Sequence, residues 1–196
     1  MARAQGVRIG VIPASEYTDQ ARFEAEQVEL FERRWLFVGH DSEVESSGDF
    51  VRRQVGRQPC LLVRAADGSI RVLVNRCSHR GNLVTHLDEG CSQRFVCPYH
   101  GWGFDTTGRL VAATAPEGLP ASFDVADFGL EQATVGLYRG FVFARLAADG
   151  PTLAEHLGRA AELLDRLCDL SPEGEIELSA GWLSHRIRCN WKLLQE

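Results

Sequence analysis

Two short segments of the chain combine cysteine with histidine. They read Cys77-Ser78-His79-Arg80-Gly81 and Cys97-Pro98-Tyr99-His100-Gly101-Trp102, with seventeen residues between His79 and Cys97. Two thiolates and two imidazoles are ligands for zinc or for an iron–sulfur cluster. Structural zinc sites usually pair cysteine with cysteine and histidine with histidine at short spacing, whereas here each segment supplies one of each. The pattern favours a [2Fe–2S] centre in which Cys77 and Cys97 hold one iron and His79 and His100 hold the other, with a structural zinc module as the weaker alternative.

The charge of this ligand set predicts how readily the centre accepts an electron. Two ferric ions and two sulfides carry about +2, so two thiolates bring the oxidised centre to about zero, whereas four would make it about −2. A centre with two histidine ligands is therefore easier to reduce, in the range of roughly −150 to +300 mV against about −400 mV for plant-type ferredoxins.

Both segments resemble the Rieske motif, and CPYHGWGFDTTGRL is similar to the second Rieske loop of aromatic-ring-hydroxylating oxygenases. The resemblance implies that Arg80 and Gly81 belong to the first loop, that Gly81 and Gly101 let the backbone approach the cluster, and that Trp102 shields one side. Respiratory Rieske proteins place disulfide cysteines where Asn82 and Tyr99 stand, and a serine donor where Trp102 stands. We therefore expect a potential at the low end of the range.

The resemblance extends over nearly the whole chain, to the N-terminal part of the α subunit of these oxygenases. It is carried by Ile12-Pro13, Tyr17-Thr18, Phe31-Glu32, Trp35–His40, Gly48–Phe50 and Asn190-Trp191-Lys192, with Glu196 beyond. In the family a second domain holds a mononuclear ferrous iron on two histidines and a carboxylate. No histidine follows His185, and no two histidines have the family's five-residue spacing. We therefore expect no mononuclear iron and no catalytic residue in this chain, which stops where a catalytic domain should begin.

The implied function is electron transfer within an oxygenase. The domain would take single electrons from a ferredoxin or flavin-dependent reductase and pass them to the mononuclear iron, in the catalytic domain of the same or a neighbouring subunit. His79 and His100 should be the more exposed ligands, because electrons leave through an edge near the surface. A stand-alone Rieske ferredoxin is the alternative, although it needs neither of the two helices predicted below nor the NWK segment. The aromatic substrate is not readable from this chain.

Short strands with turns between them must position the two segments. The strands are expected at Phe50–Val55, Cys60–Arg64, Ile70–Asn75, Arg94–Cys97, Gly103–Asp105, from Arg109, Ala133–Tyr138, Phe141–Leu146, Ile176–Leu178 and Trp182–Cys189. Asp67-Gly68 predicts a hairpin turn. The fold class is mainly β, a Rieske-type small antiparallel β-sandwich or barrel with a cluster-binding subdomain at about 75–105.

Two helices flank these strands. One is expected from about Asp19 to Arg34, capped by Thr18 or Asp19, with an apolar stripe that covers a core. The second lies near 152–168 and begins with the capping box Thr152-x-x-Glu155. We expect an N-terminal arm and helix at 1–40, the Rieske domain at 41–150, and a helix, strands and connector at 151–196.

The remaining candidate residues and the composition set limits on function. His40, His86, His156 and His185 are expected at the surface or with satisfied hydrogen bonds, and Cys60, Cys91, Cys168 and Cys189 as small buried groups. The net charge is −6, from 21 basic and 27 acidic residues, which argues against a nucleic-acid partner. No stretch approaches the length of a membrane helix and no secretory signal is visible, so the expected location is the cytoplasm.

Overall fold

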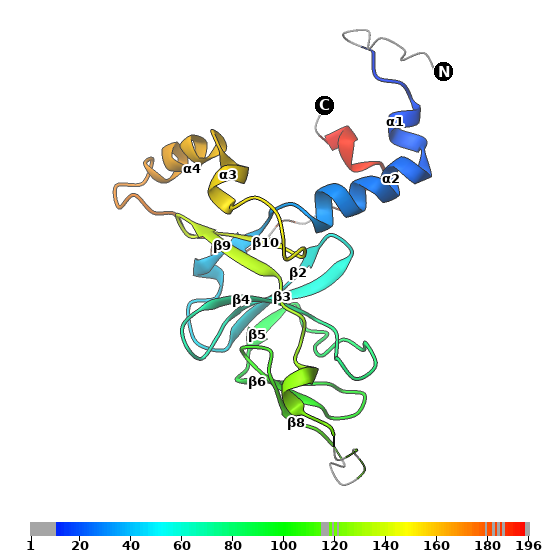
Figure 1. Cartoon of the computed structure of the whole chain (residues 1–196). Coiled ribbons are helices and arrows are strands. Elements are labelled where there is room, and N and C mark those ends of the chain that lie inside the picture. Colours follow the sequence, from blue (N-terminus) through cyan, green and yellow to red (C-terminus); the bar gives the residue numbers. More distant parts are fainter. Residues whose placement is uncertain are drawn as a thin grey trace.

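The structure is a computed structural model that describes residues 11–114, 118, 120, 122–178, 180–181, 183, 185 and 187–194. Within these residues ten strands form three antiparallel sheets. Their arrangement can be followed in Figure 1. The strand orders are β1-β10-β9, β4-β3-β2-β5 and β6-β7-β8. The prediction of a mainly β fold is confirmed.

The central sheet contains three of the predicted strands and one that was not predicted. Its members are β2 (Asp49–Val55), β3 (Gln58–Arg64), β4 (Ile70–Val74) and β5 (Glu89–Cys91). The expected turn joins β3 to β4, and Gly68 has φ +81°, a conformation that glycine adopts without strain. β5 escapes prediction because Glu-Gly-Cys has low strand propensity and pairs only along the edge of β2.

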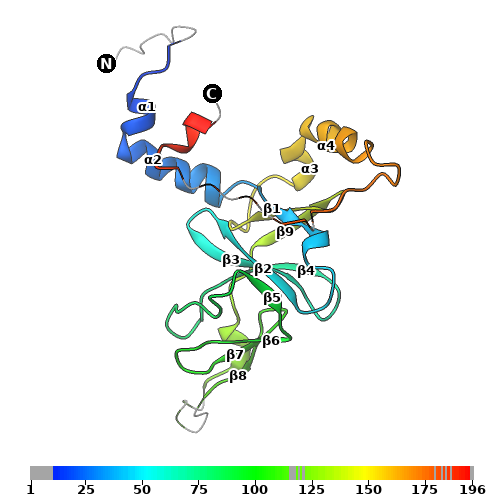
Figure 2. The ribbon, with the colours of Figure 1, turned by 180° about the vertical axis from the view of Figure 1, so that it is seen from behind.

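A smaller sheet lies at the end of the molecule away from the helices (Figures 1 and 2). It consists of β6 (Arg94–Val96), β7 (Gly103–Asp105) and β8 (Leu110–Ala112). The short helix η4 (Val125–Phe128) packs beside β8. This sheet presents the second cysteine and histidine segment between β6 and β7.

The third sheet lies on the side of the β region that faces α3 and α4 (Figures 1 and 2). It is built from β1 (Leu36–His40), β9 (Thr134–Tyr138) and β10 (Phe141–Arg145). Arg139 and Gly140 both have positive φ, as a tight hairpin between β9 and β10 requires. A short helix η2 (Asp41–Glu43) follows β1.

The middle strand β3 and its neighbour β4 are buried on both faces, which explains why they read as continuous apolar runs. Successive side chains of a strand point to opposite faces. Accordingly Cys60 and Leu62 belong to a core shared with β1 and β10, whereas Leu61 and Val63 belong to a core shared with the small sheet. That second core includes Cys77 and Cys97. The two cysteines are thus packed into the folded core of the domain.

The N-terminal helix differs from its prediction. It comprises α1 (Ser15–Thr18), α2 (Gln20–Glu26) and a π-helical continuation η1 (Gln27–Glu32), with no buried residue in any of them. Asp19 caps α2 by accepting a hydrogen bond from the Arg22 N–H, as expected. The helix does not cover a core, because it projects from the sheets and lies beside the C-terminal segment (Figures 1 and 2). There the ring of Phe31 packs edge-on against Trp191 at 5.2 Å.

The second predicted helix is present but divided. α3 (Leu153–Leu157) begins with the predicted capping box between Thr152 and Glu155, and α4 (Ala160–Cys168) follows. Gly158 ends α3 with φ +46°. The predicted apolar stripe is therefore divided between two helices with different axes. The hydroxyl of Tyr138 donates to the Asp165 carboxylate and ties α4 to β9.

The C-terminal region contains less regular structure than expected. No strand forms at Ile176–Leu178, and the predicted strand Trp182–Cys189 and the end residue Glu196 lie wholly or partly outside the described residues. A short helix η5 (Trp191–Leu194) follows Asn190 and lies beside α2 (Figure 1). Among the helices described, none combines the length and the hydropathy needed to cross a bilayer.

Candidate metal centre

The two segments that carry cysteine and histidine form loops with the same backbone hydrogen bonds. Loop 1 (residues 75–83) follows β4, and loop 2 (residues 97–102) joins β6 to β7. In each, the cysteine N–H donates to the carbonyl five residues later, and the glycine N–H donates back to the cysteine carbonyl: Cys77 to Asn82, Gly81 to Cys77, Cys97 to Trp102 and Gly101 to Cys97, at 2.8, 2.8, 2.8 and 2.9 Å. The two loops therefore present cysteine and histidine from equivalent turns.

Both turns depend on glycine. Gly81 has φ +72° and Gly101 has φ +71°, a region in which residues with a Cβ are strained. At Gly101 a Cβ would also lie 2.8 Å from the Thr114 hydroxyl, whereas at Gly81 it would meet no described atom within 4 Å. The requirement at Gly81 is therefore conformational, and close approach of the backbone to a cluster stays a prediction.

The two thiols lie together and are buried. Cys77 and Cys97 are 3% and 2% exposed, and they belong to the same cluster of buried residues. Burial raises the pKa of the Cys77 thiol, and the neighbouring Cys97 sulfur adds to this, while the backbone N–H groups of His79 and Arg80 lower it. These N–H groups stabilise the thiolate, which is the form that binds a metal.

The two imidazoles also lie together, nearer the surface than the thiols. The ring centroids of His79 and His100 are 4.8 Å apart, and both side chains are half-buried. Burial, His100 and Arg80 each lower the pKa of His79, which favours the neutral form that coordinates metals. Nδ1 of His79 is buried without a hydrogen-bond partner in the described part of the chain. An orphaned buried nitrogen is rare, and this one fits a metal ligand.

These donors fit two irons better than one zinc ion. Among the described residues, no three His, Cys, Asp or Glu side chains converge as they would around a single ion. Instead the thiols Cys77 and Cys97 form one pair and the imidazoles His79 and His100 form another. A [2Fe–2S] cluster with one ligand pair on each iron uses both pairs, and His79 Nδ1 would gain the partner it lacks. The residues present fit that cluster.

An aromatic group lies against His79. Trp102, 4% exposed, stacks on the His79 ring with centroids 4.7 Å apart and planes at 12°. Phe123 and Phe128 contact the indole edge-on at 5.8 and 5.7 Å, and they stack on each other. Trp102 thus covers one imidazole from the protein side. Tyr99 is 59% exposed and lies over His100 on the solvent side, with ring centroids 3.9 Å apart.

Side-chain hydroxyls that the sequence analysis did not single out tie the loops to neighbouring segments. Ser78 donates to the Phe128 carbonyl at 2.6 Å, and Thr114 donates to the His100 carbonyl at 2.5 Å. Ser78 was visible inside the motif, but its partner lies fifty residues away in the sequence and nothing local indicates it. Arg80 is exposed and contributes its N–H to the Cys77 sulfur.

The other histidines lie away from this site, and two cysteine predictions were wrong. His40 is buried and bonded to Ser42, whereas the remaining three are exposed: His86, His156 and His185. Cys60 and Cys168 are buried as predicted, but Cys91 and Cys189 are exposed. Both exposed cysteines belong to edge or irregular segments that no second layer covers in the described structure.

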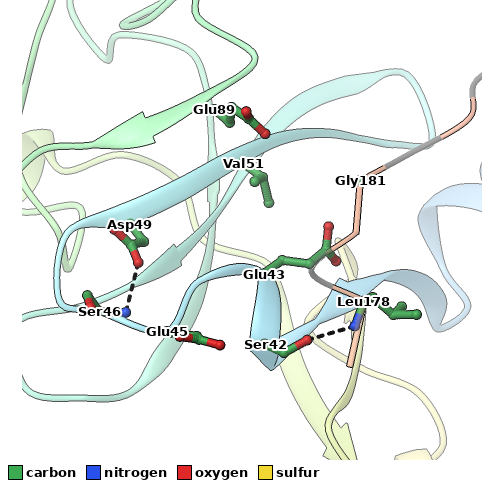
Figure 3. Close-up of a pocket in the computed structure, with 9 residues that line it drawn as sticks. All are labelled: Ser42, Glu43, Glu45, Ser46, Asp49, Val51, Glu89, Leu178 and Gly181. Atoms are coloured by element: carbon green, nitrogen blue, oxygen red, sulfur yellow. Dashed lines mark hydrogen bonds between the residues drawn. The ribbon is translucent and has the colours of Figure 1, made fainter. Parts of the chain in front are cut away.

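A separate cavity of about 320 Å³ lies between β2, η2 and the C-terminal segment (Figure 3). Carboxylates dominate its lining, and two of them are engaged in internal bonds: Glu43 pairs with Arg53, and Asp49 accepts from the Ser46 N–H at 2.8 Å. The Leu178 N–H donates to the Ser42 hydroxyl at 2.9 Å. Its lining contains no thiol and no imidazole, so this cavity is no part of the metal centre.

Comparisons with known proteins agree with the site. Residues 34–124 match the family of the Rieske [2Fe–2S] domain. The α subunit of biphenyl 2,3-dioxygenase from Rhodococcus jostii is 38% identical over 189 residues, which cover 96% of this chain and 41% of that subunit. The α subunit of an N,N-dimethyl phenylurea N-demethylase from Sphingobium is 40% identical over 191 residues, covering 96% and 41%. The crystal structure of naphthalene 1,2-dioxygenase from Rhodococcus bound to indole superposes with a TM-score of 0.75 at 30% identity, covering 80% of this chain and 36% of that one.

The fold and the paired donors therefore define a Rieske [2Fe–2S] domain. The chain spans about two fifths of the length of the curated relatives it matches. Within that span it is similar to a set of oxygenase subunits that includes a biphenyl 2,3-dioxygenase α subunit, an anthranilate 1,2-dioxygenase large subunit and an N-demethylase α subunit.

Proposed function

We propose that this chain is the electron-transferring Rieske domain of a ring-hydroxylating oxygenase α subunit. It would accept single electrons from a ferredoxin or flavin-dependent reductase and deliver them to a mononuclear non-haem iron, where O₂-dependent hydroxylation of an aromatic substrate takes place. The iron would belong to a catalytic domain of the same or a neighbouring subunit, since the printed sequence lacks the two-histidine pattern. We further propose the division into 1–40, 41–150 and 151–196, and a cytoplasmic site of action.

The observation that carries the proposal is the different exposure of the two donor pairs. Cys77 and Cys97 are packed into the core, whereas His79 and His100 lie half-buried at the loop tips. When bound, a Rieske cluster supplies reversible one-electron chemistry. The thiol pair would hold one iron of the cluster inside the protein, and the imidazole pair would provide the edge of the cluster through which an electron can leave.

The chain's own residues would perform three tasks around that edge. The N–H groups of His79 and Arg80 would stabilise the Cys77 thiolate against the effect of its burial. Trp102 excludes water from the inner face of the His79 ring. The outer ring nitrogens of His79 and His100 would donate hydrogen bonds to a carboxylate of the catalytic domain, which orients both rings for transfer.

The test of cluster binding uses a matched pair of cysteine variants. The chain, purified without oxygen, should contain two irons and two sulfides and be reddish-brown, with a one-electron midpoint potential below zero. Cys77→Ser should lose the colour and the iron, while Cys91→Ser should keep both, because Cys91 is exposed on β5. A colourless protein with zinc would refute the proposal and the ferredoxin alternative together.

The transfer role needs a separate measurement. The reduced chain should be reoxidised by an α subunit that contains the mononuclear iron but whose own Rieske domain cannot bind a cluster, in a rapid-mixing experiment. No reoxidation, together with normal cluster content, would leave a Rieske protein with a different electron acceptor.

A further inference from the structure

The two loops share one turn but are closed differently at their bases. Loop 2 is the tip of a hairpin, in which Val96 pairs with Gly103 directly beside the loop. Loop 1 leaves β4 and has no returning partner strand, because the next strand, β5, pairs with β2. The backbone ladder that closes loop 2 therefore has no counterpart at loop 1 within the described residues.

The side chain of Asn75 supplies hydrogen bonds at the base of loop 1, where loop 2 has a backbone ladder. Asn75 is fully buried and lies two residues before Cys77. Its Oδ1 accepts from the N–H groups of Val84 and Thr85 at 3.0 and 3.2 Å, and its Nδ2 donates to the Thr85 carbonyl at 2.9 Å. Three hydrogen bonds thus join the start of loop 1 to the segment just after it, as a ladder would.

A further contact fixes Asn75 itself. Its backbone N–H donates to the Pro59 carbonyl of β3 at 2.8 Å. At the tip of loop 1, Ser78 donates to the Phe128 carbonyl, which belongs to η4 behind Trp102. Loop 1 is therefore anchored by side chains at its base and at its tip.

We propose that Asn75 is the positioning residue of loop 1, which holds Cys77 and His79 in register with loop 2 before any cluster binds. The inference rests on the proposed cluster-binding function. Asn75 does not touch the cluster ligands through its amide, so it acts by closing the loop. Because a buried amide meets no competing water, its three bonds fix the loop's two ends. Loop 2 needs no such residue, because its ends are held by β6 and β7.

Hydrogen exchange tests the claim without reference to activity. In Asn75→Ala the amides of Val84 and Thr85 lose their acceptor, and each should exchange about tenfold faster or more, the change that one net hydrogen bond produces. Amides of loop 2 should keep their protection. Thr106→Val is the matched control, since Thr106 is equally buried and its hydroxyl accepts from the Ala66 N–H. Equal loss of protection in both loops, or none at Val84 and Thr85, would overturn the proposal.

Cluster content then shows whether the positioning matters. Asn75→Ala should retain less than half of the iron and sulfide of Thr106→Val. Each variant is prepared and measured at the same number of degrees below its own melting temperature. Full content in Asn75→Ala would refute this inference and leave the proposed function intact. Absence of a cluster from the unmodified chain would instead refute the proposed function.

If Asn75→Ala folds poorly, a milder pair of variants tests the anchoring of each loop separately. Ser78→Ala removes the tie at the tip of loop 1, and Thr114→Ala removes the tie of loop 2. Pulsed EPR of the reduced chain reports the two histidine nitrogens individually. Ser78→Ala should broaden the signal of one nitrogen and Thr114→Ala that of the other, whereas identical changes in both variants would contradict separate anchoring.

Discussion

Replacing Trp102 with alanine tests whether the aromatic group positions His79. Trp102 is buried, and its indole contacts the rings of His79, Phe123 and Phe128. Removing a buried tryptophan costs about 3–5 kcal/mol of the free energy of unfolding. The three ring contacts, at about 0.5–1.5 kcal/mol each, account for a large share of that cost.

The assay combines thermal unfolding with spectroscopy of the reduced chain. A loss of about 3–5 kcal/mol lowers the melting temperature by roughly 6–20 °C, because each kcal/mol corresponds to about 2–4 °C in a chain of this size. Since the stack on one face of His79 also disappears, the EPR coupling of one histidine nitrogen should broaden while the other stays sharp.

Trp35→Ala provides the control for this prediction. Trp35 is also buried, but it packs with Phe141 and Phe143 in a different core. The two variants should lose comparable stability, and only Trp102→Ala should alter the histidine signal. If Trp102→Ala unfolds at the expected lower temperature with both nitrogen couplings unchanged, stacking does not orient His79 and the reasoning fails.

Three further outcomes are expected. His100→Cys adds a thiolate charge and should lower the midpoint potential by about 60 mV or more, a tenfold change for a one-electron couple, and an unchanged potential in a redox titration would contradict the charge argument. Burial raises the pKa of Cys60 to about 12, so iodoacetamide at pH 8 should modify exposed Cys91 well before Cys60, as read by mass spectrometry. The hydrogen bond from Lys192 lowers the pKa of the Glu26 carboxyl. This bond therefore stabilises the C-terminal helix η5 fully at pH values above the usual pKa of a glutamate. The stabilisation is lost as the pH falls through the lowered pKa of Glu26. The protection factors of the η5 amides, which correct for the pH dependence of intrinsic exchange, should fall at acid pH, and Glu26→Gln should show the lower protection already at pH 7.

Much of the fold was predictable because its strands are apolar or alternate in a regular way. The runs at 60–64 and 70–74 could hardly be anything but buried strands, and Asp67-Gly68 placed the turn between them. The short edge strand at 89–91 was not predictable, because its register comes from β2 rather than from its own residues. The N-terminal helix was predicted but its partner was not. Periodicity identifies an apolar face and does not say whether that face meets a sheet or a distant segment such as Trp191.

The site shows the same division between local and distant information. The four proposed donors stand out in the sequence because their types and spacing lie within two short segments. The residues that hold those segments do not. Asn75 precedes the motif and was expected only as the last residue of the strand Ile70–Asn75, and the partners of Ser78 and Thr114 depend on how the chain returns. Hydrogen bonds to backbone carbonyls leave no residue pattern, because every residue offers a carbonyl.

The double burial of β3 has a consequence for how substitutions act on this protein. Leu61 and Leu62 are neighbours in sequence, yet one packs with the cysteines and the other with the sheet that faces the helices. A substitution of Leu61 is therefore expected to disturb the core that contains Cys77 and Cys97, and a substitution of Leu62 to disturb the core shared with β1 and β10. Because both side chains leave the same strand, a shift of the β3 backbone would reach both cores at once, whereas a change confined to one side chain acts on one core.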